Sequence, residues 1–182
     1  HLAVNDLVVL ESTTYPGTTE EVVGPILAES GLDVPTQVKL AFSPERVDPG
    51  NATYGITNTP KVVGGLDEES SQAAYDFYAR FCDTVVIAKG AREAERAKLL
   101  ENSYRHVNIA LINELAVLSH ELEIDVWDAI RCAATKPFGF QAFYPGPGVG
   151  GHCIPIDPNY LSHHVRSRLG HTFRFIELAQ DI

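Results

Sequence analysis

Apolar and polar positions in the first half of the chain alternate between two patterns. Brief apolar runs bounded by polar or turn residues predict buried strands. Four such runs occupy 7–10, 38–42, 61–65 and 84–87. Capping residues between the runs predict one helix over 19–30, begun by Thr18 or Thr19, and another that Asp67 caps and that reaches about Phe81. The order β-α-β, β-α-β indicates an α/β fold with a largely parallel sheet.

A different pattern begins at Ala91. Residues 92–122 contain neither proline nor glycine, and apolar residues recur at helical spacing from Ala94 to Leu122, which predicts one helix of about 30 residues. A helix of that length more often spans an interface or bridges two domains than lies on one small sheet. Three shorter helices are predicted after it: 125–134 with Asp125 as its cap, 158–168 ended by Gly170, and one that starts at Thr172.

The change of pattern places a domain boundary near residue 90. Residues 1–90 are expected to form the C-terminal part of a Rossmann-like, doubly wound parallel sheet, and residues 91–182 an all-α domain. The chain contains no methionine, opens directly before an apolar run and stops inside a predicted helix. We therefore expect it to be an internal piece of a longer protein.

Composition narrows the classes of function. The 182 residues are 45% hydrophobic and carry a formal net charge of −10 with no basic run, which argues against nucleic acid or an anionic membrane surface as a partner. No apolar stretch approaches a membrane span, and no signal peptide opens the chain. Cys82, Cys132 and Cys153 are too far apart and odd in number for a disulfide framework, so reduced thiols in the cytoplasm are expected.

One loop concentrates the candidate chemistry. Residues 143–158 place Cys153 after four glycines, one of them Gly150, and four residues before Asp157. Glycines let the backbone approach a ligand closely, and a cysteine is a strong nucleophile once its pKa is lowered. A turn with an incidental cysteine is the alternative, but the glycine density and the nearby carboxylate favour a catalytic thiol.

The long predicted helix carries a second candidate group. Glu95, Lys98 and Asn102 follow one another at helical spacing, and Lys98 and Asn102 share a face one turn apart. An amide beside an ammonium suits a site that binds an oxyanion or a substrate hydroxyl. The alternative is a solvated stripe, in which Glu95 and Lys98 form an ordinary surface pair.

Two further candidates follow predicted strands. Glu45 lies in a loop just after the strand 38–42, and Thr14 lies after the strand 7–10, where doubly wound sheets bind their ligands. The alternatives are a loop carboxylate paired with Arg46 and a hydroxyl that starts a helix.

His152 next to Cys153 suggests a Cys-His pair, but adjacent residues seldom face each other. A zinc site from His152, Cys153, His163 and His164 lacks any familiar ligand spacing, so no metal is expected.

Four segments of the sequence together match the motifs of a known protein family. They are 11–20, 42–46, 95–102 and 150–153 with Asp157. In this order, and across essentially the whole chain, they resemble the UDP-glucose/GDP-mannose dehydrogenase family, the NAD-dependent nucleotide-sugar 6-dehydrogenases. The amino-acid sequence of segments 41–51 and 144–148 is closest to the branch that oxidises UDP-N-acetylglucosamine.

The resemblance implies a four-electron oxidation of a sugar C6 alcohol to a carboxylate with two NAD⁺ in turn. Cys153 would be the nucleophile that forms a thiohemiacetal and then a thioester, which water hydrolyses. Lys98 would hold the oxyanions that develop at C6, and Asn102 would donate a hydrogen bond beside it.

The same resemblance gives the remaining roles. Asp157 would act on the catalytic water or tune Lys98, Glu45 would be a base in thioester hydrolysis, and Thr14 would position a water or the nicotinamide end. The residues implied for the cofactor are Thr14, Glu45 and Cys153. Those implied for the UDP-sugar are Glu45, Arg46, Lys98, Asn102, Phe143, Tyr144 and Gly150.

The chain also departs from the family pattern. It has no G-x-G-x-x-G after a strand and no C-terminal domain to grip the uridine diphosphate. Ile156 stands where UDP-glucose members carry a basic residue, and Lys136 is near the position of an arginine that reaches across their dimer. We therefore expect this piece to be inactive by itself but to form a homodimer through the long helix, the family's dimer element.

Other interpretations remain open at this point. The chain is alternatively a non-catalytic helical dimerisation module, a thiol hydrolase that uses Cys153 and His152 without NAD, or a zinc enzyme. UDP-glucose and UDP-N-acetylmannosamine are alternative substrates. An active-site Cys153 should alkylate faster than Cys82 and Cys132, which are expected to be core residues.

Overall fold

The computed structural model describes residues 1–48, 50–150, 154 and 156–182. They fall into two compact units, 1–99 and 100–182. The division lies inside one long helix, and the boundary expected near residue 90 stays a prediction.

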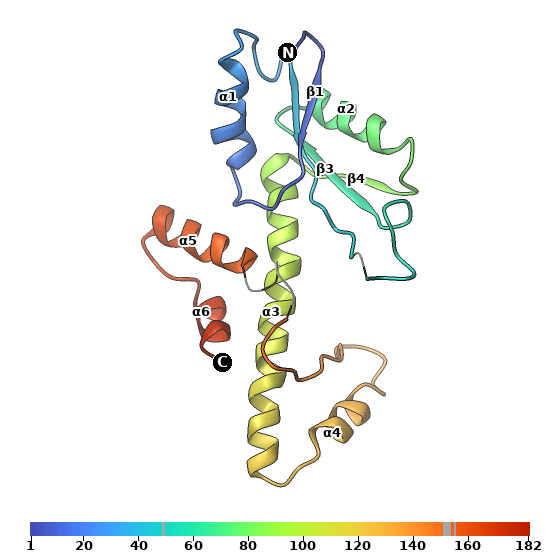
Figure 1. Ribbon diagram of the computed structural model, residues 1–182, viewed down its shortest axis with the longest axis vertical. Coiled ribbons are helices and arrows are strands. Elements are labelled where there is room, and N and C mark those ends of the chain that lie inside the picture. Colours follow the sequence, from blue (N-terminus) through green and yellow to red (C-terminus); the bar gives the residue numbers. More distant parts are fainter. Residues whose placement is uncertain (49, 151–153, 155) are drawn as a thin grey trace. The chain divides into compact units, whose positions relative to one another are not determined.

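The first unit is built on a four-stranded sheet in the order β1-β2-β3-β4 (Figure 1). The strands are β1 (Leu7–Leu10), β2 (Lys39–Phe42), β3 (Lys61–Gly65) and β4 (Val85–Ile87), close to the predicted runs. The pairs β1/β2 and β3/β4 are parallel, as expected, but β3 runs antiparallel to β2. A parallel neighbour needs a crossover, usually through a helix, and the described part of 43–60 contains none.

Helices cover both faces of this sheet. A helical segment, η1 (Thr19–Val23) and α1 (Gly24–Ala28), follows β1, and α2 (Glu68–Tyr78) follows β3. Ala74 and Tyr78 of α2 pack with Ala41 on one face, while Phe42 packs on the other face against the start of α3 (Ala91–Glu121). Successive strand residues point to opposite faces, so β2 contributes to both hydrophobic clusters.

Of the two helix caps predicted for the first unit, one is confirmed and the other is wrong. Asp67 caps α2 as predicted, because its carboxylate accepts a hydrogen bond from the Ser70 N–H at 2.7 Å. The predicted cap at Thr18 is wrong: its hydroxyl donates to the Tyr15 carbonyl at 2.8 Å and makes no capping bond. Thr19 does not cap either, since its hydroxyl donates to Glu95.

Glycine is required where β3 approaches α3. A Cβ added to Gly64 would lie 2.2 Å from the Gly90 carbonyl oxygen, a distance at which the backbone must shift. Gly64 and Gly90 therefore let the end of β3 lie directly against the turn that begins the long helix.

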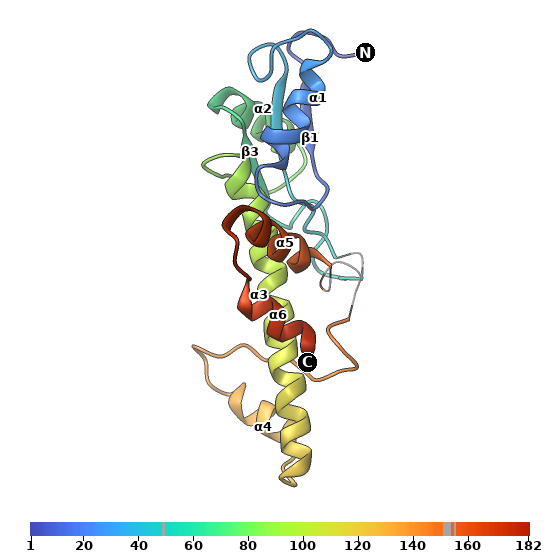
Figure 2. The same ribbon diagram turned by 90° about the vertical axis from the view of Figure 1, so that its left-hand side faces the viewer.

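The second unit contains most of α3, with α4 (Val126–Ala133), α5 (Asp157–Leu169) and α6 (Arg174–Asp181). Asp125 caps α4 by accepting from the Trp127 N–H at 2.9 Å, and Gly170 ends α5 at φ +71, both as predicted. The last helix begins at Arg174 instead of Thr172. Figure 2 shows α5 and α6 beside α3, where Asn159 and Ala179 line a cavity together with His106.

Candidate functional site

The C-terminal ends of β1 and β2 meet at one edge of the sheet. Leu10 and Phe42 are parallel register partners, and the Ser43 N–H donates to the Leu10 carbonyl at 3.0 Å. The loops that carry Thr14 and Glu45 therefore leave the sheet at the same edge. Open α/β sheets bind ligands at the carboxyl ends of their strands, so the two predicted loop candidates lie at a suitable place.

The loop after β1 is fixed by Glu95 of α3. This side chain is fully buried, and its carboxylate accepts from the Gly17 N–H at 2.5 Å, the Thr19 N–H at 2.9 Å and the Thr19 hydroxyl at 2.7 Å. Within that loop the Thr14 hydroxyl donates to the Thr18 hydroxyl at 2.5 Å. The alternative of a solvated Glu95 is thus wrong, because the carboxylate serves as an internal acceptor one turn before Lys98.

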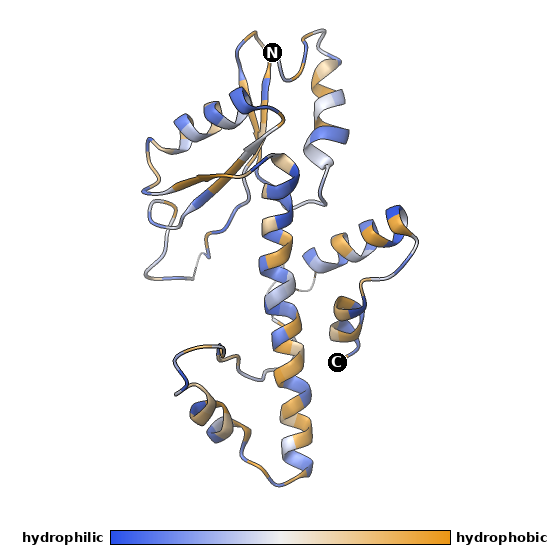
Figure 3. Cartoon of the chain, turned by 180° about the vertical axis from the view of Figure 1, so that it is seen from behind, coloured by the Kyte–Doolittle hydropathy of each residue, from blue (hydrophilic) through white to orange (hydrophobic). Residues whose placement is uncertain are grey.

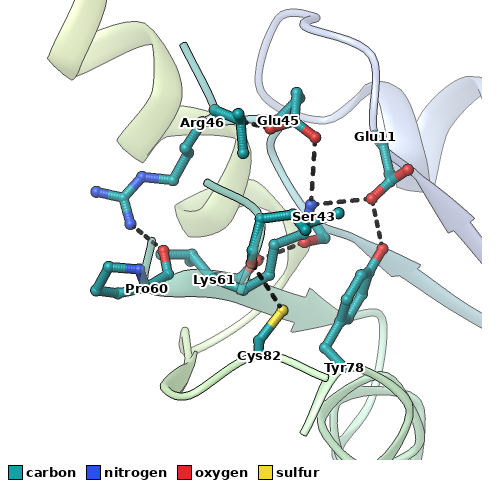
Figure 4. A network of polar contacts seen from close by, with 11 residues as sticks. Glu11, Ser43, Glu45, Arg46, Pro60, Lys61, Tyr78 and Cys82 are labelled. Carbon is teal, nitrogen blue, oxygen red and sulfur yellow. Dashed lines mark hydrogen bonds and ion pairs between the residues drawn. The ribbon is translucent and has the colours of Figure 1, made fainter. Parts of the chain in front are cut away.

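Glu45 is held by two different groups. Its Oε1 accepts from the Val47 N–H at 2.6 Å, and its Oε2 lies 3.8 Å from the Lys61 ammonium (Figure 4). The Glu45 side chain is 51% exposed. Arg46 donates to the Pro60 carbonyl at 2.6 Å. The described ion-pair partner of Glu45 is therefore Lys61, a residue that sequence reasoning did not select.

Lys61 is buried and has half-exposed polar partners. Its ammonium donates to Glu11 Oε1 at 2.9 Å, the Tyr78 hydroxyl donates to the same oxygen at 2.7 Å, and the ammonium lies 4.9 Å from the centre of the Tyr78 ring. Burial raises the pKa of Glu11, but the hydrogen bonds from Tyr78 and Lys61 and the Lys61 charge outweigh burial, so the pKa is lowered. Burial and the hydrogen bond to Glu11 raise the pKa of Tyr78 well above its usual range.

In the second unit, Asn102 and Asp157 are in direct contact. Asn102 Nδ2 donates to Asp157 Oδ2 at 2.5 Å, and both side chains are buried. Asn102 lies on α3, while Asp157 is the first residue of α5. Two motifs that are far apart in the sequence therefore meet here. Lys98 is half-buried one turn before Asn102 on the same helix.

The candidate catalytic loop is described in part. Phe143 packs edge-on against Tyr104 at 5.8 Å between ring centres, and Tyr144 stacks on Trp127 at 6.2 Å. Gly150 has φ +69, a conformation that favours glycine. The predicted nucleophile, Cys153, and its neighbour His152 lie outside the described residues.

Directly after Cys153, the loop reaches α3 through a backbone group. The Ile154 carbonyl oxygen lies 3.2 Å from Nδ1 of the buried His106. On the near side of the loop, the Gly146 N–H donates to Asn113 of α3 at 2.9 Å. His106 was not singled out from the sequence, because a histidine on an apolar helix carries no distinguishing pattern. Asn113 belongs to the long-helix segment of the family resemblance, but no contact with the loop was predicted for it.

Other features bear on chemistry and partners. Cys82 is buried, but Cys132 is exposed, so its expected place in the core is wrong: on α4 the inward position is that of Ile130. Among the described residues, no three His, Cys, Asp or Glu side chains are grouped to hold a metal. None of the described helices combines the length and the apolar character needed to cross a bilayer.

Comparison with known families decides what kind of chain this is. The NAD binding domain of the UDP-glucose/GDP-mannose dehydrogenase family matches residues 1–82, and its central domain matches residues 92–182. The chain belongs to this family. The expected α/β fold with a Rossmann-like first part and a helical central part is thereby confirmed.

Relatives of two substrate types are about equally similar to this family member. UDP-N-acetyl-D-mannosamine dehydrogenase of Methanococcus aeolicus is 42% identical over 161 residues, which are 88% of this chain and 36% of the relative. UDP-N-acetyl-D-glucosamine 6-dehydrogenase of Salmonella typhi is 41% identical over 160 residues, 87% of this chain and 37% of the relative. The chain thus spans less than two fifths of these relatives, and the preference for UDP-N-acetylglucosamine stays a prediction.

A solved structure shares the fold closely. UDP-D-ManNAc dehydrogenase from Pyrococcus horikoshii superposes with a TM-score of 0.89 at 37% identity, over 99% of this chain and 42% of that one. NAD is the cofactor that the matched domain indicates. That Thr14, Glu45 and Cys153 contact this cofactor stays a prediction.

Proposed function

We propose that the full-length protein that contains this chain is an NAD-dependent UDP-sugar 6-dehydrogenase. It oxidises the C6 hydroxyl of UDP-N-acetylglucosamine to a carboxylate through a covalent intermediate on Cys153. The observation that carries the proposal is the buried Asn102–Asp157 hydrogen bond, which joins the motif of the long helix to the residue four positions after Cys153. This chain alone is expected to be inactive.

The reaction divides into two oxidations and a hydrolysis. NAD⁺, when bound, accepts one hydride in each oxidation. The Cys153 thiolate adds to the C6 aldehyde that the first oxidation produces, and a C–S bond forms while the carbonyl oxygen becomes an oxyanion. Loss of the second hydride leaves a thioester, and attack by water breaks its C–S bond and returns the thiolate.

The buried pair supplies an orienting contact for these steps. An amide nitrogen carries two N–H donors, and Asp157 accepts one from Asn102. The other is available for the C6 oxygen, beside the Lys98 ammonium, where negative charge develops. Glu45, at the edge of the sheet, serves as the base that takes a proton from the attacking water. Thr14 positions that water or the nicotinamide end, while Arg46, Phe143, Tyr144 and Gly150 contact the UDP-sugar.

We also propose that the protein forms a homodimer through α3. A row of leucines recurs at spacings of four, three and four residues, as in a coiled-coil seam: Leu111, Leu115 and Leu118 of α3, and Leu122 just after its end. These leucines are 43–69% exposed in the single chain. Figure 3 shows this half of α3 as predominantly hydrophobic. A row of leucines that is exposed in the single chain indicates an interface. A dimerisation module without catalytic activity would have the same exposed row. We also propose a cytoplasmic location, which the free Cys82 and Cys132 support.

The test uses the full-length protein with UDP-N-acetylglucosamine, UDP-N-acetylmannosamine and UDP-glucose. Two NADH per sugar consumed, together with loss of turnover in Cys153→Ser, is the expected result. The sugar with the highest kcat/KM identifies the substrate. Absence of NADH with every UDP-sugar would contradict the dehydrogenase and favour the dimerisation module, whereas hydrolase activity without NAD would favour the thiol hydrolase.

A further inference from the structure

The reversal of β3 brings an unexpected cation to the ligand edge of the sheet. In the antiparallel register, Phe42 of β2 pairs with Gly64 of β3. Extending that register by three residues places Glu45 across from Lys61, the first residue of β3. The 3.8 Å separation between the Lys61 ammonium and Glu45 Oε2 agrees with this placement. In a parallel arrangement the start of β3 would lie at the opposite edge.

Lys61 is held rigidly enough to orient another side chain. Only 7% of its side chain is exposed, and a buried ammonium requires polar partners. Glu11 and the face of the Tyr78 ring provide them, and the Tyr78 hydroxyl fixes Glu11 in turn. Tyr78 belongs to the hydrophobic core of the sheet. The ammonium is therefore anchored through a core residue, and Figure 4 shows it between Glu11 and Glu45 with the Tyr78 hydroxyl on Glu11.

Glu45, by contrast, faces outward from this anchor. The Val47 N–H binds Oε1 and the Lys61 charge faces Oε2 beyond hydrogen-bonding distance, while half of the side chain is exposed. This arrangement fixes the direction of the carboxylate and leaves Oε2 free to accept a proton from a water. A direct hydrogen bond from Lys61 goes to Glu11 instead.

We propose that Lys61 is a positioning residue that orients the Glu45 carboxylate for hydrolysis of the thioester. The inference rests on the proposed function, since it assigns a partner to the base of that reaction. Lys61 touches neither the thioester nor the water. Its loss should leave both oxidations largely intact and slow the release of the sugar acid from Cys153.

The experiment is a single turnover of the full-length enzyme, with intact-protein mass spectrometry to detect the acyl group on Cys153. Lys61→Met is expected to slow hydrolysis at least about 10-fold and to accumulate the acyl-enzyme, with hydride transfer changed less than about 2-fold. Lys61→Arg, which keeps the charge, should restore much of the rate. Lys39→Met is the matched control, because Lys39 lies on the neighbouring strand β2 but forms its ion pair with Glu69 of α2.

A double-mutant cycle separates positioning from a general effect on the fold. If Lys61 acts through Glu45, Lys61→Met should add almost nothing to the slow hydrolysis of Glu45→Gln. Independent, multiplying effects would overturn the proposal, as would equal slowing of every step or a Lys61→Met enzyme with no acyl-enzyme. Should Lys61→Met fail to melt cooperatively, Lys61→Gln takes its place with the same expected outcome. A wild-type enzyme that forms no NADH would instead refute the proposed function.

Discussion

Asn102 donates a hydrogen bond to Asp157 at 2.5 Å, although 55 residues separate them in the sequence. The bond joins the middle of α3 to the first residue of α5, near the end of the candidate catalytic loop 143–158. The far end of that loop is thereby attached to the helix that carries the proposed oxyanion site. Geometry at the loop and geometry at the helix are consequently coupled.

Removal of the Asn102 amide should destabilise the full-length protein. Asn102→Ala takes one donor away from a buried carboxylate, and such a loss typically costs about 1–3 kcal/mol in the free energy of unfolding. Urea denaturation measures it. Asn108→Ala is the matched control, since that amide donates to the Tyr104 carbonyl of its own helix. Equal stability of the two variants would contradict a structural contribution from the Asn102–Asp157 bond.

Glu95 should be among the most sensitive positions of the first unit. Glu95→Ala leaves the Gly17 and Thr19 donors without their buried acceptor, and we expect a loss of about 3 kcal/mol or more. Glu95→Gln keeps one acceptor oxygen and should lose less. The exposed Glu93 on the same helix turn provides the control, Glu93→Ala. Equal melting temperatures for Glu95→Ala and Glu93→Ala would refute the structural role of the Glu95 carboxylate.

The lowered pKa of Glu11 predicts a pH dependence of stability. A carboxyl whose pKa is lower folded than unfolded stabilises the protein above its unfolded value, here about 4.5, and this contribution disappears as the pH falls through the folded pKa. The difference in free energy of unfolding between the wild type and Glu11→Gln should therefore become smaller as the pH falls. Chemical unfolding at a series of pH values measures the gap; a gap independent of pH would contradict the prediction.

Cysteine reactivity should follow exposure. Burial raises the pKa of Cys82, and the nearby Lys61 charge does not cancel this effect, whereas Cys132 is exposed. Limiting iodoacetamide, followed by peptide mass spectrometry, should label Cys132 at least about 10-fold faster than Cys82. The two rates should converge in denaturing urea, which serves as the control. The proposed nucleophile Cys153 should react faster than both in the full-length protein; slower labelling than at Cys132 would argue against an activated thiol.

Charge placed in the leucine row of α3 should dissociate the dimer. Leu115→Glu with Leu118→Glu brings like charges together in the proposed seam, so light scattering should report about half the mass of the wild type. Glu114→Lys, an exposed charge reversal on the same helix, tests for a non-specific effect. A wild-type protein that is monomeric at the outset, or a double variant that stays dimeric, would remove this surface from consideration.

Features with local causes were predictable from the sequence. The apolar runs gave the four strands, the absence of proline and glycine gave the extent of α3, and Asp67 and Asp125 marked helix starts. The direction of β3 was not predictable in this way, since an apolar run has the same pattern in either direction. Its reversal depends on a connection without a crossover helix.

The missed site residues have a related explanation. Lys61 looked like an ordinary charged position, and for Glu95 the sequence left a surface pair with Lys98 open as an alternative. The burial of both side chains depends on partners that lie far away in the chain. The acceptor role of Glu95 is set by backbone N–H groups, which have no sequence signature. Asn102 and Asp157, in contrast, were selected through the family resemblance, and the structure brings them together.

Glu95 also determines what the turn after β1 is able to recognise. Backbone N–H groups at such a turn ordinarily form a receptor for an inorganic or nucleotide phosphate. Here the anion is the Glu95 carboxylate of the same protein, which accepts three hydrogen bonds from the turn. The Gly17 and Thr19 N–H groups are therefore already bound to an internal carboxylate and are not available to the diphosphate of a dinucleotide.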